Sequence, residues 1–219
     1  MKKLFAINGS PRRNGNTAQL LQAAMRGAEA AGAETELIHL YPLHFKGCIS
    51  CFACKLKDRE HGICAIKDEL SPILTQLKEA DAIIFGSPIY FMNLSACMVA
   101  FLERFLFSNY LYTVENSSVF PKTMPSAFFY TMNATEEQAR QFHLEDKLAM
   151  YDMGSENILK VKPCRLMAYN TVQFKDYSKY EASMFSEADK KAYREANWPQ
   201  LCEKAHTIGK SLIESAVDL

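Results

Sequence analysis

The sequence predicts an α/β protein in which a doubly wound parallel sheet of five strands lies between two helical layers, three layers in all. Short apolar runs alternate with helical patterns along the 219 residues, which is typical of a parallel sheet covered on both faces. The run 81–86 is apolar almost throughout, as a strand buried on both faces requires. A polar stretch at 9–17 joins the first apolar run to the first helical pattern.

The remaining elements follow from periodicity and from glycine and proline positions. We expect strands at 2–8, 34–40, 81–86, 125–131 and 165–174. We expect helices at 17–31, 68–78, 94–107, 134–150 and from 189 onwards, the last interrupted at Trp198-Pro199. Long connections are expected at 47–64, 108–123 and 175–186. The length suits one α/β domain spanning residues 1–219.

Charge and composition exclude several classes of partner. Lys and Arg together number 25, and so do Asp and Glu, so the formal net charge is zero, which argues against nucleic acid or an anionic membrane. Residues 1–7 hold too few apolar residues for a signal peptide, and no run approaches a transmembrane helix. We therefore expect a cytoplasmic protein. Seven cysteines, an odd number, indicate thiols or metal ligands and not a disulfide framework.

The stretch Gly9-Ser-Pro-Arg-Arg-Asn-Gly-Asn-Thr17 has the composition of a phosphate-binding loop. Its glycines permit a tight turn, and its hydroxyl and amide side chains lie where a helix begins. A nucleoside-triphosphate loop has four residues between its glycines and then lysine, whereas here five intervene and Asn16 occupies the lysine position. A dinucleotide fingerprint is also absent. A terminal monophosphate fits better, which favours FMN; the alternative is that Asn16 or Thr17 only caps the helix.

A second loop is expected after the strand 81–86, in the stretch Ser87-Pro-Ile-Tyr-Phe91. Ligands of open α/β sheets bind beyond the carboxyl ends of the strands, so this loop would face the first across a crevice. One loop would hold the phosphate and the other the ring. The alternative for Tyr90 and Phe91 is ordinary core packing.

Together, Gly9-Ser-Pro-Arg-Arg-Asn-Gly-Asn-Thr17 and Gly86-Ser-Pro-Ile-Tyr90 resemble the flavodoxin-like NAD(P)H-dependent FMN reductase family, in the branch related to the iron-sulfur flavoproteins. The resemblance implies strand order 2-1-3-4-5. It implies phosphate binding by Ser10, Arg12, Asn14, Asn16 and Thr17, and ring contacts from Pro88, Ile89, Tyr90 and Phe91. It further implies a third flavin loop after the fourth strand, at Thr131, Met132 and Asn133.

The same resemblance implies an activity. Electrons would pass from NAD(P)H through bound FMN to a small acceptor: a quinone, a flavin, an azo or nitro compound, or a metal ion. We assign no catalytic side chain, because the cofactor carries this chemistry and the protein positions it. An alternative is a binding module that senses flavin or redox state without turnover.

The cysteine segment leaves more than one interpretation open. Cys48, Cys51 and Cys54 have the C-x2-C-x2-C spacing that can surround an iron-sulfur cluster, and Cys64 is a candidate fourth ligand. Iron-sulfur flavoproteins carry a similar compact motif, but the insert 55–63 is longer here. A loop without metal, a four-iron cluster, a zinc site and a redox dithiol all remain. With a cluster, the protein would be an electron carrier with a ferredoxin-like partner. We expect Cys97, Cys164 and Cys202 to be buried.

The helix 94–107 is more apolar than one face packed on a sheet requires, and the segment 175–186 carries aromatic residues. Both features predict subunit contacts, in a homodimer or tetramer.

Overall fold

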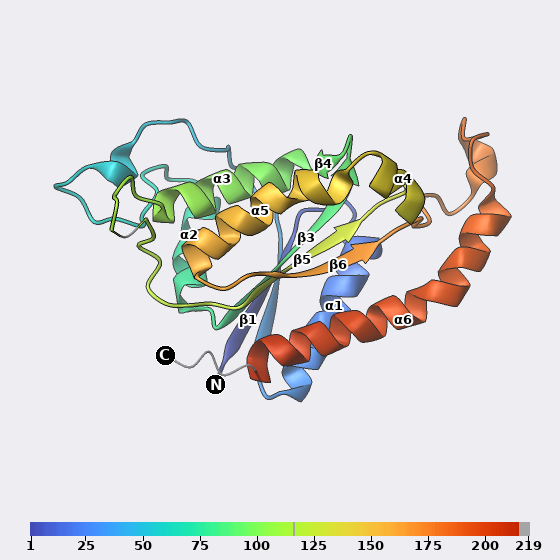
Figure 1. Cartoon of the computed structure of the whole chain (residues 1–219), viewed down its shortest axis with the longest axis horizontal. Coiled ribbons are helices and arrows are strands. Elements are labelled where there is room, and N and C mark those ends of the chain that lie inside the picture. Colours follow the sequence, from blue (N-terminus) through green and yellow to red (C-terminus); the bar gives the residue numbers. More distant parts are fainter. Residues whose placement is uncertain (116, 215–219) are drawn as a thin grey trace.

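A parallel five-stranded sheet forms the centre of the computed structural model, which describes residues 1–115 and 117–214 (Figure 1). Its order is β2 (Glu34–His39), β1 (Lys3–Asn8), β3 (Ala82–Tyr90), β5 (Ser126–Thr131) and β6 (Cys164–Ala168). The expected order 2-1-3-4-5 is confirmed, because β4 (Asn93–Leu94) is a two-residue strand that pairs antiparallel with β3 outside this path. Residue 116 of the expected connection 108–123, and residues 215–219 of the expected domain, lie outside the described residues.

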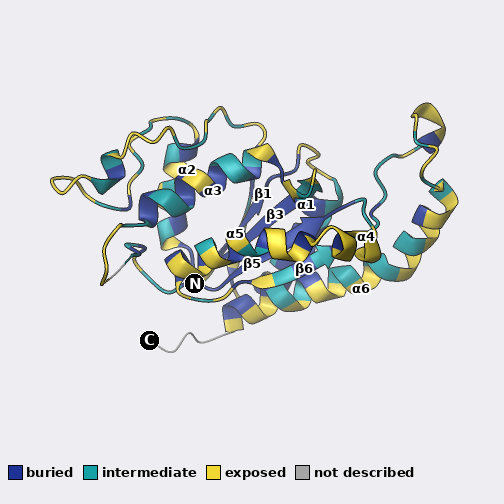
Figure 2. Ribbon diagram, turned by 45° about the horizontal axis from the view of Figure 1, so that its top comes forward, coloured by how far each residue is buried: buried dark blue, intermediate teal, exposed yellow. Residues whose placement is uncertain are grey.

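Helices cover both faces of the sheet and complete three layers (Figures 1 and 2). One face carries α1 (Asn16–Ala30) and α6 (Glu187–Glu214). The other carries α2 (Leu70–Gln76), α3 (Ala96–Asn109) and α5 (Leu144–Leu159), with α4 (Glu136–Gln141) before α5. Single 3₁₀ turns lie at Ala53–Lys55, Leu77–Glu79 and Tyr177–Lys179. Within residues 1–115 and 117–214, we find no helix with both the length and the apolar character that a bilayer span needs.

Strand alternation gives the two faces different packing. On β1, Leu4 and Ala6 point toward α1 and α6, whereas Phe5 and Ile7 point toward α2 and α3. On the face covered by α1 and α6, small residues let these two helices approach each other closely. A Cβ on Gly27 of α1 would lie 1.9 Å from the backbone oxygen of His206 on α6, and a Cβ on Gly209 equally close to that of Ala24.

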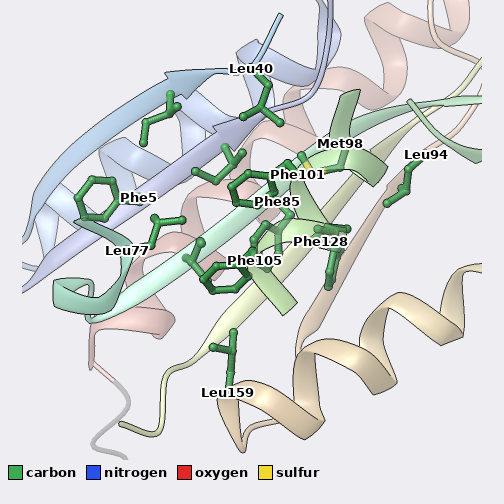
Figure 3. Packing of buried hydrophobic residues seen from close by; sticks show 14 of the residues in the cluster. Phe5, Leu40, Leu77, Phe85, Leu94, Met98, Phe101, Phe105, Phe128 and Leu159 are labelled. Atoms are coloured by element: carbon green, nitrogen blue, oxygen red, sulfur yellow. The ribbon is translucent and has the colours of Figure 1, made fainter. Parts of the chain in front are cut away.

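The opposite face is filled by aromatic rings (Figure 3). Phe85 and Phe128 on neighbouring strands have ring centroids 4.8 Å apart, and Phe101 and Phe105 of α3 stack at 5.8 Å. All four are buried. Such offset and tilted pairs add to the free energy gained from burial, so this face anchors α3 firmly to the sheet.

One departure from expectation lies at the end of β3. The stretch 87–90, expected as a loop, continues the strand, because Ser87 and Pro88 pair in register with Tyr130 and Thr131 of β5. The chain turns only at Phe91 and Met92, whose φ angles of 48° and 62° are left-handed, and returns as β4. Pairing with β5 therefore outweighs the local turn preference of Ser-Pro.

Three further boundaries differ from the expected ones. The helix expected at 134–150 is divided into α4 and α5 because His143 adopts a left-handed conformation with φ 51°. The strand expected at 165–174 ends at Ala168. The interruption expected at Trp198-Pro199 is absent, since α6 runs through Pro199, which is solvent-exposed. Figure 1 shows that α6 bends along its length, as an interior proline predicts.

Candidate functional site

A cavity of about 620 Å³ lies at the carboxyl edge of the sheet. Its walls come from the loop after β1, the end of β3, the segments after β5 and β6, and the first turns of α6. Loops that follow parallel strands converge at this edge, which is where open α/β sheets bind ligands. The volume lies within the range of cofactor and small-molecule sites.

The loop after β1 is held by a chain of hydrogen bonds that begins at Asn8. The Asn8 side chain is buried, and its Oδ1 accepts a bond of 3.0 Å from the Ser10 backbone N–H. The Ser10 hydroxyl accepts one of 3.2 Å from the Arg12 N–H, and the Arg12 carbonyl accepts one of 3.1 Å from the Gly15 N–H. Sequence reasoning did not single out Asn8, although a polar residue closing an apolar strand was a usable signal.

The helix α1 begins at the cavity with no side-chain cap. Its N-cap is Gly15, no side chain of the described residues bonds to the first-turn N–H groups, and no acidic residue lies in that turn. The alternative interpretation, that Asn16 or Thr17 serves as the cap, therefore does not describe this structure. Because Gly15, Asn16 and Thr17 all line the cavity, the positive end of the helix dipole lies at its wall.

Side chains of this loop fasten three segments together. Thr17 Oγ1 lies 2.8 Å from Thr131 Oγ1 at the end of β5. The Asn16 amide donates a bond of 3.0 Å to the Val172 carbonyl, and the Arg12 guanidinium donates to the Gln173 carbonyl. Arg12 and Asn16 thus bond to backbone acceptors that an anion could replace.

The structure brings nearly all of the predicted cofactor-binding residues to this one cavity. The members that line it are Ser10, Arg12, Asn14, Asn16, Thr17, Pro88, Ile89, Tyr90, Thr131, Met132 and Asn133. Phe91 is the exception: it is not among the described residues that line the cavity, its φ angle of 48° is left-handed and its side chain is fully exposed, so its contact with the ring stays a prediction. The alternative of core packing does not apply to Tyr90 either, since 45% of that residue is exposed.

Sequence reasoning missed the wall formed by the segment after β6. Residues 171–175 line the cavity together with Gln19, Lys191 and Arg194. Lys190 holds this wall to the loop after β5, because its buried ammonium donates to Asn170 Oδ1 at 2.6 Å and to the Asn133 carbonyl at 3.3 Å. Extending the predicted strand to residue 174 concealed this segment; the aromatic residues around it were the available signal.

The cavity is positively charged although the chain as a whole is neutral. Among the described residues that line it, the charged ones are Arg12, Lys175, Lys191 and Arg194, and none is acidic. Pro88, Ile89 and Tyr90 at the end of β3 contribute apolar surface to the same cavity. The arrangement suits a ligand with an anionic end and a flat apolar end.

The predicted metal ligands form a separate feature along α3. Cys48, Cys51, Cys54 and Cys64 line one small cavity, and none of the described residues lines both this cavity and the first. Figure 1 shows the loop that carries them at the end of α3 opposite to β4.

Side chains of α3 hold the cysteine loop in place. Glu103 Oε2 accepts a bond of 3.0 Å from the Cys48 N–H, and Arg104 Nε donates one of 3.0 Å to Cys64 Sγ. The Lys55 ammonium bonds to the carbonyls of Phe107 and Tyr110. These bonds hold the cysteine loop against α3.

Arg104 is the charged centre of this region. It is 1% exposed, and its guanidinium contacts Asp68 at 2.8 Å and the Lys46 carbonyl at 3.0 Å. Burial alone would raise the pKa of Asp68, but hydrogen bonding and the charge of Arg104 outweigh it and lower that pKa.

The donor set fits an iron-sulfur cluster in kind, since four thiols share one cavity and two of their sulfurs accept N–H bonds, Cys48 from Ser50 and Cys64 from Arg104. The cavity between the four cysteines is too small for a cluster, because its volume of about 10 Å³ leaves room for little more than a water molecule. Within the described residues, no three His, Cys, Asp or Glu side chains are grouped closely enough for a single metal ion.

The other cysteines correct our expectation of burial. Cys164 is exposed because it opens the edge strand β6, and Cys97 and Cys202 are half-buried. Burial raises the pKa of the Cys97 thiol to about 11.

Sheet order, helical layers and a polar loop at the end of the first strand define a flavodoxin-like α/β protein. Residues 2–157 match the family described as NADPH-dependent FMN reductase, and the chain belongs to that family. The resemblance inferred from the two loops is thereby confirmed.

Individual relatives agree with this assignment. The chain is 42% identical over 102 residues to an iron-sulfur flavoprotein of Methanocaldococcus jannaschii, covering 47% of this chain and 51% of the relative. It spans about half the length of the curated relatives it matches. In fold it is similar to the NAD(P)H:quinone oxidoreductase of Methanothermobacter marburgensis, with a TM-score of 0.69, 16% identity and 98% coverage of both chains. It is also similar to an azoreductase of Bacillus anthracis, with a TM-score of 0.64, 14% identity and coverage of 96% and 100%.

Proposed function

We propose that the protein is an oxidoreductase that passes electrons from NAD(P)H through bound FMN to a small acceptor. The observation that carries this proposal is the cavity at the carboxyl edge, where an uncapped helix start and basic side chains face apolar residues at the end of β3. Membership of the NADPH-dependent FMN reductase family supports the choice of cofactor and donor.

The residues of the first loop would hold the phosphate. Asn16 and Arg12 would exchange the carbonyls of Val172 and Gln173 for phosphate oxygens, joined by the hydroxyls of Ser10 and Thr17. Charge-assisted bonds to an anion are stronger than those to a neutral carbonyl, so this exchange is favourable.

The end of β3 would hold the flavin ring. Pro88 and Ile89 supply apolar contacts, and Tyr90 offers a half-exposed aromatic face at the edge of the cavity. When bound, FMN supplies the redox chemistry, accepting hydride from NAD(P)H and passing electrons on. We assign no side chain to proton transfer; the residues that line the cavity would bind and orient the cofactor.

We propose a quinone or an azo compound as the acceptor, with flavins, nitro compounds and metal ions as the other candidates. The similar solved structures named as a quinone oxidoreductase and an azoreductase support this order. Purified protein should show two resolved flavin bands in its visible spectrum and should oxidise NADPH with a soluble quinone or an azo dye. An FMN-loaded preparation that turns over none of these acceptors would contradict the proposal.

A second candidate function is electron transfer through a four-iron cluster to a ferredoxin-like partner. It is favoured by the four cysteines on one cavity and by the left-handed φ angles of Ser50 and Phe52, 53° and 54°, which are costly for residues other than glycine. Relatives named iron-sulfur flavoprotein support it. Cys48, Cys51, Cys54 and Cys64 would hold the cluster, which needs more space than the cavity between them has here.

We further propose a single FMN-binding domain over residues 1–219, a cytoplasmic location, and assembly into a homodimer or tetramer. An apolar groove of about 460 Å³ between α3 and α5 supports the assembly, because Val99, Leu102 and Leu106 line it.

A further inference from the structure

Arg194 connects the C-terminal helix to the loop after β1. It belongs to α6 and lines the same cavity as that loop. Its guanidinium donates bonds of 2.8 Å to Asn16 Oδ1 and to Gln19 Oε1, both on the first turn of α1. The centroid of the Trp198 ring lies 4.0 Å from the guanidinium carbon of Arg194, and this stacking holds the plane of the guanidinium group.

The charge of Arg194 is not neutralised by the chain. Both of its acceptors are neutral amides, and across residues 1–115 and 117–214 no carboxylate lies within ion-pair distance of it. The neighbouring Lys191, by contrast, pairs with Glu187 at 2.5 Å. Burial lowers the pKa of Arg194, with only a partial opposing effect from Cys202. A half-buried cation without a counter-ion is stabilised when an anion enters the same cavity.

The geometry also fixes what Arg194 does to Asn16. Arg194 bonds to the side-chain oxygen of Asn16. The side-chain nitrogen of Asn16 therefore points toward the cavity wall, where it donates to the Val172 carbonyl. That nitrogen is a donor that an anion at the start of α1 would use.

We propose that Arg194 is a positioning residue for the phosphate of FMN, and that through it the chain selects phosphorylated flavin over riboflavin. The inference rests on the proposed function, because it assumes that FMN binds in this cavity. The phosphate gains a nearby positive charge and an oriented Asn16 amide, whereas riboflavin, which lacks the phosphate, gains neither.

The test titrates apoprotein with FMN and, separately, with riboflavin, following the quenching of flavin fluorescence. The variants are Arg194→Gln, Arg194→Lys and the control Arg26→Gln, which removes a positive charge from an exposed position on α1 outside the cavity. We expect Arg194→Gln to weaken FMN binding about tenfold or more and to leave riboflavin binding unchanged. Arg194→Lys should lie between Arg194→Gln and the wild type, and Arg26→Gln should match the wild type.

Riboflavin affinity serves as the internal check on folding. Unchanged FMN affinity in Arg194→Gln would overturn the inference. Equal losses of FMN and riboflavin affinity in both Arg194 variants would also overturn it, because they would indicate a merely structural role. Wild-type protein that binds neither flavin would overturn the proposed function and this inference with it, which separates the two failures.

Discussion

Thr17 Oγ1 and Thr131 Oγ1 lie 2.8 Å apart, joining the first turn of α1 to the last residue of β5 across 114 positions of sequence. Both residues are almost completely buried and both line the cavity at the carboxyl edge. This bond therefore holds the loop after β1 against the loop after β5. Such preorganisation lowers the entropic cost of binding.

Replacing the polar groups of the first loop should weaken FMN binding. Thr17→Val removes a hydroxyl at similar volume, and Asn16→Leu removes an amide donor, so each loses hydrogen bonding to the phosphate. We expect each variant to bind FMN on the order of tenfold more weakly or worse in a calorimetric titration of apoprotein. Thr75→Val on α2, an exposed position outside the cavity, is the matched control. Unchanged FMN affinity in both loop variants would contradict the prediction that this loop binds the phosphate.

The pair Arg104–Asp68 should be important for stability. Arg104→Met leaves Asp68 without its partner, and breaking a buried ion pair costs about 3–5 kcal/mol of unfolding free energy. Lys122→Met, which breaks the more exposed pair with Asp81, should cost no more than about 1 kcal/mol. Urea unfolding followed by circular dichroism compares the two. Similar losses of unfolding free energy in both variants would show that the Arg104–Asp68 pair stabilises the fold no more than the exposed pair does.

The same pair predicts a dependence on acid. The pKa of Asp68 in the folded protein is lowered below its ordinary value of 3.8, so its stabilising effect is fully present above that value. The effect is lost as pH falls through the lowered folded-state pKa. Between neutral pH and pH about 3, the wild type should therefore lose more stability than Asp68→Asn. Parallel stability profiles for the two proteins would contradict this assignment.

Anaerobic reconstitution tests the cysteine segment. If the cluster forms, wild-type protein should hold close to four irons and as many acid-labile sulfides per chain. Cys51→Ala should abolish that signal while FMN stays bound, because the two cavities share no lining residue. Cys164→Ala, at an exposed cysteine far along the chain, should retain the iron. Reconstituted wild-type protein without iron would leave the segment as a structural loop.

The groove between α3 and α5 predicts a homo-oligomer. Leu106→Glu places a charge in this apolar groove and should shift the sedimentation coefficient toward that of a monomer. Lys147→Glu changes charge on α5 outside the groove and should not. A wild-type protein that sediments as a well-folded monomer at micromolar concentration would refute the prediction.

Much of the architecture could be predicted because local patterns and tertiary packing agree. The buried run on β3 and the glycine-containing loop before α1 are readable from sequence, and the family resemblance implied the sheet order that the structure shows. The predicted boundaries were wrong where pairing between residues far apart in the sequence determines the local structure. Nothing local to Ser87 and Pro88 reveals that Tyr130 and Thr131 extend the sheet beside them, and nothing local to Phe91 reveals the left-handed turn.

The missed part of the site has the same origin. Arg194 contacts Asn16 across 178 positions, and Lys190 contacts Asn133 across 57, so neither is visible in a local motif. The helix expected from residue 189 onwards is observed as α6, but the sequence did not reveal which of its polar residues would reach the cavity. The four cysteines line one small cavity, but their role as metal ligands stays a prediction. The buried Arg104 beside Cys64 was not visible in their spacing, because it depends on the packing of α3.

Anaerobic mixing of FMN-loaded protein with NADPH or NADH tests the central claim most directly. If the protein is an FMN-dependent oxidoreductase, one equivalent of at least one donor should bleach both visible flavin bands, and a quinone added afterwards should restore them. A protein that binds FMN tightly but whose bands remain unchanged with both donors would contradict the account, and would indicate a flavin-binding module without turnover.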